Sequence, residues 1–103
     1  MSQYVLAPSA RRDLTAIREY HLDVAGIRVA RRIIVDFVEA FRLLAKNPGL
    51  GHRRVDLAED RHLLFWAVGD YLIVYRAAGS RIEIVMIAHG YRDIATIVRE
   101  RSV

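Results

Sequence analysis

The chain has 103 residues, of which 53% are hydrophobic and 27% charged, and its formal net charge is +4. This length is typical of one domain, the apolar content excludes a disordered chain, and the absence of cysteine excludes disulfides and thiolate metal sites. No apolar run approaches the ~20 residues of a membrane span, and the first residues lack the charged and apolar regions of a signal peptide, so we expect a cytoplasmic protein with no membrane partner.

The N-terminal part predicts a short strand followed by an amphipathic helix. Residues 3–6 resemble a strand, and Pro8 suits the first position of a helix. Apolar side chains then recur at spacings of three and four, which predicts a helix from about residue 8 to residue 24. The stripe consists of Ala10, Leu14, Ile17, His21 and Val24.

A second helix is predicted after Gly26, which interrupts the first pattern. Its charged face includes the i,i+4 pair Arg32 and Asp36, a solvated pair worth a few tenths of a kcal/mol. Asn47-Pro48-Gly49 ends it, and the short connection predicts an antiparallel helical hairpin. The apolar stripe of this helix is Ile27, Ala30, Ile34, Phe37, Phe41 and Leu44, and its opposite face carries Arg28, Arg32, Asp36, Glu39 and Lys46.

The remaining chain predicts a loop over residues 49–61, three strands and a short helix. The strands are residues 62–68, 71–76 and 81–88, and Gly69-Asp70 suits a two-residue hairpin turn. In the last strand, Ile82, Ile84 and Met86 alternate with Glu83, Val85 and Ile87. Tyr71 and Tyr75 should share one face, half-buried with their hydroxyls at its rim. Asp93 suits the N-cap of the final helix.

These elements predict one α+β domain over residues 1–103 with the order β-α-α-β-β-β-α. An antiparallel sheet should carry the helical hairpin on one face, with a helical tail at the C-terminus. Tyr4 and Leu6 should join the same sheet, because a lone strand would leave its backbone groups unpaired. The expected large core residues are Phe37, Phe41, Phe65 and Trp66.

The histidines do not predict a metal site, and we expect no cofactor. No pair among His21, His52, His62 and His89 has the i,i+4 spacing of helical ligands, and no carboxylate cluster completes a set. There is also no phosphate-binding glycine loop and no G-x-S-x-G sequence.

Basic residues have two interpretations. Lys46 is the only lysine, so the charge comes from arginine, which either reflects a GC-rich genome or forms a surface for phosphates or an acidic partner. Arg53 and Arg54 lie in a basic loop that Asp56, Glu59 and Asp60 dilute. The loop is therefore either a solvated segment or a contact for an acidic partner.

The sequence HGYRD, residues 89–93, follows the last predicted strand. Gly90 suits an unusual backbone angle at the strand exit. His89, Tyr91 and Arg92 have no evident structural role, and we expect them near a sheet face that also presents Arg76. Such a group has the side chains for acid/base cleavage of RNA, but it equally suits a binding surface and hinge.

The whole chain resembles the ParE branch of the RelE/ParE toxins of bacterial toxin–antitoxin systems. The matching segments, in order, are APSARRDLTAI, NPGLGHRR, VGDYLIVYR and IAHGYRDI. The resemblance implies a helical hairpin on an antiparallel sheet with a C-terminal tail, as expected above. Where such chains usually have Ser before the helix-opening Pro, this one has Ala7, so the first helix lacks a cap worth ~1 kcal/mol.

The resemblance implies a toxin of a plasmid-stabilisation type that a ParD-like antitoxin neutralises. RelE-like relatives cleave messenger RNA on the ribosome, but their central-strand arginine and tail tyrosine correspond here to Leu72 and a position near Val98. Only Arg92 keeps its position, with Arg53 and Arg54 as partial substitutes for the lysines of that site. The resemblance therefore favours a non-enzymatic inhibitor of DNA gyrase, without catalytic residues and without sequence-specific DNA binding by the toxin alone. A ribosome-dependent endoribonuclease and a non-toxic antitoxin-binding relative remain the alternatives.

The candidate functional residues fall into two sets. The candidates for target contact or toxicity are Arg76, His89, Tyr91, Arg92 and Arg99. The candidates for antitoxin binding are Arg53, Arg54 and Arg92.

Overall fold

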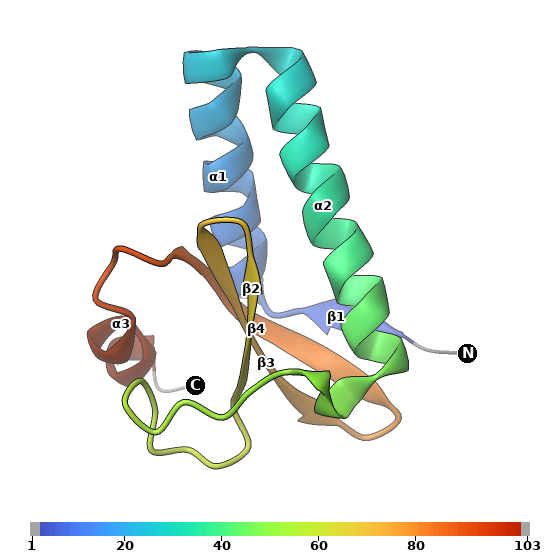
Figure 1. Cartoon of the computed structure of the whole chain (residues 1–103), viewed down its shortest axis with the longest axis vertical. Helices are drawn as coiled ribbons and strands as arrows, with labels where there is room; N and C mark the ends of the chain where they lie inside the picture. Colours follow the sequence, from blue (N-terminus) through green and yellow to red (C-terminus); the bar gives the residue numbers. More distant parts are fainter. Residues whose placement is uncertain (1–2, 102–103) are drawn as a thin grey trace.

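A four-stranded sheet lies between a helical hairpin and a C-terminal helix in the computed structural model, which describes residues 3–101 (Figure 1). The observed order confirms the predicted β-α-α-β-β-β-α arrangement, with an added 3-10 turn after the hairpin. No helix in this described range is long and apolar enough to cross a membrane. The elements are β1 (Tyr4–Leu6), α1 (Pro8–Ala25), α2 (Ile27–Lys46), η1 (Pro48–Leu50), β2 (Leu64–Val68), β3 (Tyr71–Ala78), β4 (Arg81–His89) and α3 (Ile94–Arg101).

The sheet is mixed, with the strand order β1-β4-β3-β2. β2, β3 and β4 form the predicted antiparallel meander, and β1 joins the sheet as expected, but it runs parallel to β4 with Tyr4 opposite Ile82. The prediction of an antiparallel sheet therefore holds for the meander and not for β1. A strand connected to its partner by a long crossover can pair in parallel. The local sequence of the strand does not indicate the direction in which it pairs.

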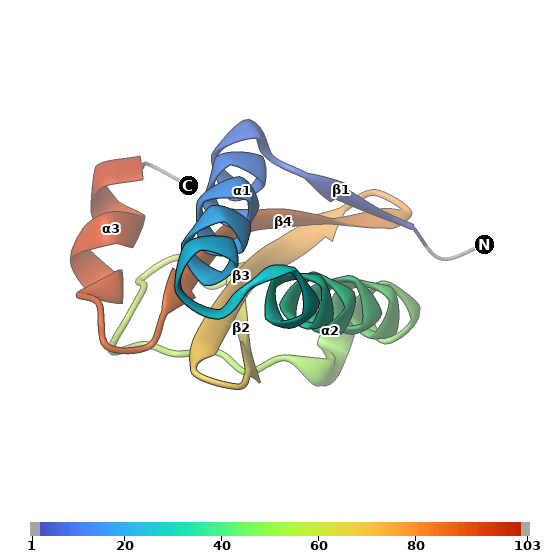
Figure 2. The same ribbon diagram turned by 90° about the horizontal axis from the view of Figure 1, so that it is seen from above.

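The helical hairpin turns at one residue. Gly26 has φ +88°, and it is the only residue between α1 and α2. The two helices reach well beyond the end of the sheet (Figure 1), and seen from above they lie side by side over it (Figure 2). Val24 and Ile27, predicted to continue the buried stripes, are consequently 63% and 46% exposed, because no sheet lies beneath them.

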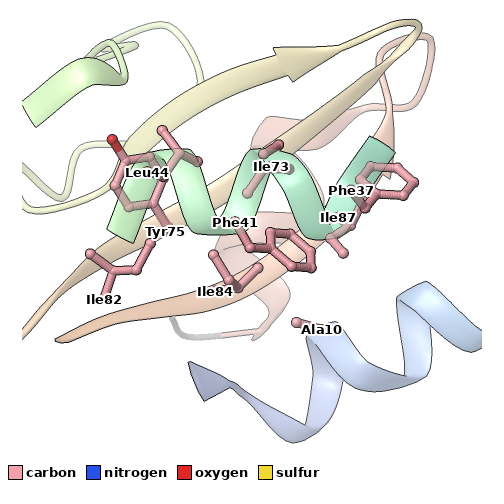
Figure 3. Close-up of a cluster of buried hydrophobic side chains, with 10 residues drawn as sticks. Ala10, Phe37, Phe41, Leu44, Ile73, Tyr75, Ile82, Ile84 and Ile87 are labelled. Atoms are coloured by element: carbon pink, nitrogen blue, oxygen red, sulfur yellow. The ribbon is translucent and has the colours of Figure 1, made fainter. Parts of the chain in front are cut away.

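One face of the sheet packs against the hairpin (Figure 3). Phe37 and Phe41 are buried as predicted, and Phe65 is buried on the opposite face. Trp66 was expected in the core, but it is only half-buried because β2 is an edge strand, and its ring stacks on His52 at 6.2 Å. The cluster beneath the hairpin contains Ala10, Phe37, Ala40, Phe41, Leu44, Ile73, Tyr75, Ile82, Ile84 and Ile87.

Tyr75 is fully buried, which differs from the half-buried position expected for it. It does share the hairpin face with Tyr71. Its hydroxyl donates to the Pro48 carbonyl at 2.7 Å and accepts from the Gly51 N–H at 2.8 Å. The loop after α2 thus supplies the polar partners that a buried phenol needs, whereas the sequence had predicted that hydroxyl at the rim of the face.

A β-bulge interrupts the alternation of β4. The pairing passes from Tyr75 opposite Ile84 to Val74 opposite Met86, which leaves Val85 as an extra residue. Val85 and Met86 therefore both face away from the hairpin, whereas Ile87 returns to the hairpin side. The predicted alternation holds through Val85 and is wrong from Met86 onward, because a bulge shifts the facing of every later side chain by one.

The other sheet face is covered by α3 and the loop that precedes β2. Ile94 and Val98 of α3 pack in a cluster with Leu63, Phe65, Val74, Val85, Met86 and Ala88. Asp93 caps α3 as predicted: its carboxylate accepts hydrogen bonds from the Thr96 N–H at 3.2 Å and from the Thr96 hydroxyl at 2.7 Å. As expected, Ala7 gives α1 no side-chain cap.

Candidate functional site

The junction after β4 is held by backbone hydrogen bonds. The Gly90 N–H donates to the Asp70 carbonyl at 2.7 Å, and the Arg92 N–H donates to the His89 carbonyl at 3.0 Å. Gly90 is not among the glycines with positive φ, so the predicted unusual backbone angle is wrong. The glycine instead allows a close approach of two chain segments, since a Cβ there would lie 3.2 Å from the Asp70 carbonyl oxygen.

Five rings from four parts of the chain form a continuous row, called here the aromatic row: Tyr20, His21, Tyr71, His89 and Tyr91. Successive ring centroids are 5.1, 6.1, 5.1 and 4.7 Å apart. α1 supplies the first two rings, the start of β3 supplies the third, the end of β4 supplies the fourth, and the turn after β4 supplies the last. The sequence HGYRD thus completes an array that begins in α1.

Four rings of the aromatic row, those of Tyr20, His21, Tyr71 and His89, line an open groove of about 470 Å³, and Tyr91 stacks on His89 outside its lining. Ala16, Ile17, Ile87 and Ala88 add apolar surface to it, while Asp13, Asp70 and Arg92 add charge. His21 and Tyr71 also border a second, smaller hollow of about 200 Å³ that Ile33, Phe37 and Val68 help to line. The two ends of the row are the most accessible, with Tyr20 60% and Tyr91 90% exposed.

Hydrogen bonds fix the orientation of the inner rings. His21 Nε2 lies 2.9 Å from the Tyr71 hydroxyl, and His89 Nδ1 accepts from the Tyr91 N–H at 3.2 Å. Neutral His89 therefore carries its proton on Nε2. Burial raises the pKa of the Tyr71 hydroxyl, and the nearby Asp70 carboxylate acts in the same direction, so Tyr71 is a neutral hydroxyl at physiological pH.

Only two charges in the groove are without an opposite partner in the described residues. Asp13 forms a bidentate ion pair with Arg101, at 2.7 and 2.8 Å, so its charge is balanced. Arg92 and Asp70 have no ion pair in residues 3–101. The site can therefore stack planar groups and exchange hydrogen bonds, but it offers a single arginine to an anion.

The candidates for target contact do not form one group. His89, Tyr91 and Arg92 lie together as expected, but Arg76 is ~16 Å along β3 from Tyr71 at the usual rise per residue. Arg76 is also engaged, since it donates to the Glu83 carboxylate on β4 at 3.0 Å. Arg99 is on α3, where it donates to the Thr96 hydroxyl and lines a hollow with residues 55–60.

The antitoxin-binding candidates are also separated. Arg54 forms a bidentate pair with its neighbour Asp56 at 3.0 and 2.8 Å, and Arg53 is exposed in the same loop. Arg92 instead lines the groove of the aromatic row. The structure thus leaves no single surface on which all three arginines meet.

Two groups of residues were missed by sequence reasoning. Arg28, Arg31 and Arg32 line an open hollow of about 590 Å³ on the outer side of α2, together with the half-exposed Val35 and the carboxylates of Asp36 and Glu39. The periodicity had assigned Arg28 and Arg32 to a solvated face. The other group is Tyr20, His21 and Tyr71, for which the one available signal was a histidine within an apolar helical stripe.

The positions that correspond to nuclease residues lie in an apolar environment. Val98 is buried on the inner face of α3, and the half-buried Leu72 packs against the same cluster. They are on the sheet face opposite the hairpin, whereas His89 contacts Tyr71 on the hairpin side. No polar or charged residue is buried within residues 3–101.

One comparison with known proteins shows the family, and another shows the fold. A model described as the ParE toxin of the type II toxin–antitoxin system, parDE, matches residues 4–94. A chain of the chromosomal ParDE system from P. aeruginosa is 22% identical, with a TM-score of 0.71 over 86% of this chain and 96% of that one. A chain of the RelBE2 toxin–antitoxin complex from Mycobacterium tuberculosis is 23% identical, with a TM-score of 0.60 over 85% and 96%. At these identities the two structures show the fold alone, and no curated protein matches the sequence.

Proposed function

Because this chain belongs to the ParE family of toxins of type II toxin–antitoxin systems, we propose that it inhibits DNA gyrase without catalysing a reaction and that a ParD-like antitoxin neutralises it. The family assignment covers β1 through the first residue of α3. The experiments below test gyrase as the target and a ParD-like antitoxin as the partner.

The apolar surroundings of Leu72 and Val98 are the observation that favours gyrase inhibition over RNA cleavage. RNA cleavage requires a base for the 2′-hydroxyl, an acid for the leaving oxygen and cations at the phosphate. Loss of one such group costs roughly 10²–10⁴-fold in rate. Here two positions to which the resemblance assigns such groups are aliphatic: Val98 lies on the inner face of α3 and Leu72 packs against the same cluster. Arg92 alone can hold a phosphate or a carboxylate, but it cannot perform acid/base chemistry.

Two assays with the same purified protein test the mechanism. We expect trapped gyrase–DNA cleavage complexes on plasmid DNA, and no codon-positioned cuts in ribosome-bound transcripts. Arg92→Ala should weaken toxicity, whereas Arg42→Ala, an exposed position on α2, should not. Transcript cuts without gyrase trapping would establish the ribonuclease alternative. Neither signal, with antitoxin binding intact, would establish a non-toxic relative.

Deletion of α3 is not a clean test of the tail. α3 covers the apolar side chains of Phe65, Val85 and Met86, so truncation before Asp93 would expose a core face and unfold the protein. Arg99→Ala leaves Ile94 and Val98 in place and therefore tests the exposed side of α3. A loss of toxicity in this variant, with an unchanged melting temperature, supports a role for α3 in target contact.

The outer side of α2 is the surface that best fits an acidic, apolar antitoxin segment. Val35 and Leu43 are 49% and 42% exposed on this helix, and Arg28, Arg31 and Arg32 surround the hollow beside Val35. An amphipathic helix of the antitoxin can place apolar residues on the exposed side chains and carboxylates on the guanidinium groups. The loop arginines Arg53 and Arg54 offer a competing surface.

Charge-reversal substitutions distinguish the outer side of α2 from the loop as the site of antitoxin binding. Co-expression with the antitoxin should give a stable co-purified complex, and Arg31→Glu should release the antitoxin at a lower salt concentration than wild type. Arg53→Glu is the matched change in the loop. A stronger effect of Arg53→Glu would show that the antitoxin contacts the loop. Separation of the wild-type proteins at physiological salt would refute the proposal that this antitoxin is the partner.

A further inference from the structure

We propose that the groove of the aromatic row binds unpaired nucleobases of a single nucleic-acid strand by stacking. The ligand class is a flexible strand of DNA or RNA, read without sequence preference. This activity is separate from the inhibition of gyrase and from antitoxin binding, and it requires neither partner.

The geometry of the row favours planar ligands. Tyr20 and Tyr91 stand at its two ends, 60% and 90% exposed, so each presents ring surface to solvent. Single exposed apolar residues are common, but four rings that line one groove, with the exposed ring of Tyr91 continuing the row from His89, are not explained by packing. Proteins that bind single strands use such rows, because every base has a face that stacks on an aromatic side chain.

The inner rings supply hydrogen-bonding groups for the edges of bases. His89 Nε2 has no hydrogen bond in the described residues, because the ring uses Nδ1 for the Tyr91 N–H. The Tyr71 hydroxyl and His21 Nε2 are hydrogen-bonded to each other. Both residues line the groove and also the smaller hollow. A splayed base can therefore find both a stacking surface and polar contacts.

The charges of the groove favour a base over an acidic peptide. Arg92 can contact one phosphate, Asp13 is neutralised by Arg101, and Asp70 repels anions at the same groove. An acidic segment with several carboxylates would meet one available cation and one like charge. Stacking therefore supplies most of the affinity, and the salt dependence should correspond to about one phosphate contact, a log–log slope of about −0.7 for a single strand.

The test is the fluorescence anisotropy of a labelled oligothymidylate titrated with the full chain, alongside an abasic strand of equal length and an oligouridylate. We expect the thymidylate to bind and the abasic strand to bind much more weakly. Tyr91→Ala and Tyr20→Ala should each reduce affinity by roughly 5- to 100-fold, which is the range for loss of one stacked base. Tyr91→Phe keeps the ring and should bind as wild type does.

Controls distinguish stacking from general attraction to a basic protein. Arg53→Ala removes an exposed arginine outside the groove and should leave affinity within about twofold, whereas Asp70→Asn should strengthen binding. Equal affinity for the abasic strand, or equal losses for Arg53→Ala and Tyr91→Ala, would show charge-driven binding and overturn the proposal. Absence of binding to all three strands would overturn it as well. If the wild-type protein binds no strand, and Tyr91→Ala loses binding to the antitoxin or to gyrase, the row is a protein contact.

Discussion

The carboxylate of Asp13 connects three elements, and its removal is the most informative perturbation of the fold. Oδ2 accepts the Ile87 N–H of β4 at 3.0 Å, and the two carboxylate oxygens receive the guanidinium of Arg101 on α3 at 2.7 and 2.8 Å. The two side chains are 14% and 28% exposed. Asp13→Ala should therefore loosen both the bulged strand and the C-terminal helix.

The expected loss follows from the bonds that are broken. The backbone N–H contributes about 0.5–1.5 kcal/mol net, and a charge-assisted, partly buried pair contributes about 1.5–3 kcal/mol. Asp13→Ala should reduce the free energy of unfolding by about 2–4 kcal/mol, with a few tenths regained from the higher helix propensity of alanine. Arg101→Leu leaves the Ile87 bond intact and should lose only about 1–2 kcal/mol.

Chemical denaturation of the single and double variants measures these values. For a domain of this size, 1 kcal/mol shifts the melting temperature by roughly 4–8 °C, so a loss of about 2–4 kcal/mol should lower the melting temperature of Asp13→Ala by ~8–32 °C. The double variant should be no less stable than Asp13→Ala alone, because both changes remove the same pair. Arg32→Leu, which breaks an exposed pair at 3.5 Å, is the control and should change stability by a few tenths of a kcal/mol. Equal losses for Asp13→Ala and Arg32→Leu would refute the reasoning.

Tyr75→Phe keeps the buried ring but removes two hydrogen bonds, so the free energy of unfolding should fall by about 1–3 kcal/mol in denaturant titrations. Gly51→Ala should have a similar effect, because the new Cβ would lie 2.5 Å from the Tyr75 hydroxyl; a double variant that loses the sum of both would contradict a shared cause. Hydrogen bonds from the Thr96 side chain and backbone hold the pKa of the Asp93 carboxyl below its usual range. The capping of α3 should therefore be complete above about pH 4 and disappear as the pH falls through the lower folded pKa. NMR or amide exchange at Thr96 across that range measures it, and fraying that begins near neutral pH would count against the assignment.

The amino-acid sequence determined the features that depend on neighbours a few residues apart. The 3.6-residue period predicted α1 and α2, and Gly26 marked the break between them. Gly69, with φ +56°, begins the turn that connects β2 to β3. Asp93 capped α3 for the same reason, since a carboxylate reaches an N–H three residues away. The segments that resemble ParE toxins gave the family, and the match over residues 4–94 confirmed it.

Tertiary structure alone decided the features whose partners are distant in the chain. The parallel pairing of β1, the bulge at Val85, the buried hydroxyl of Tyr75 and the role of Gly90 all depend on contacts with another element. His21 and Tyr71 are 50 residues apart, and Asp13 and Arg101 are 88 apart. A periodic pattern states which face of an element is apolar, but not which polar groups meet across faces. The groove of the aromatic row therefore exists only once α1, β3 and β4 have packed together.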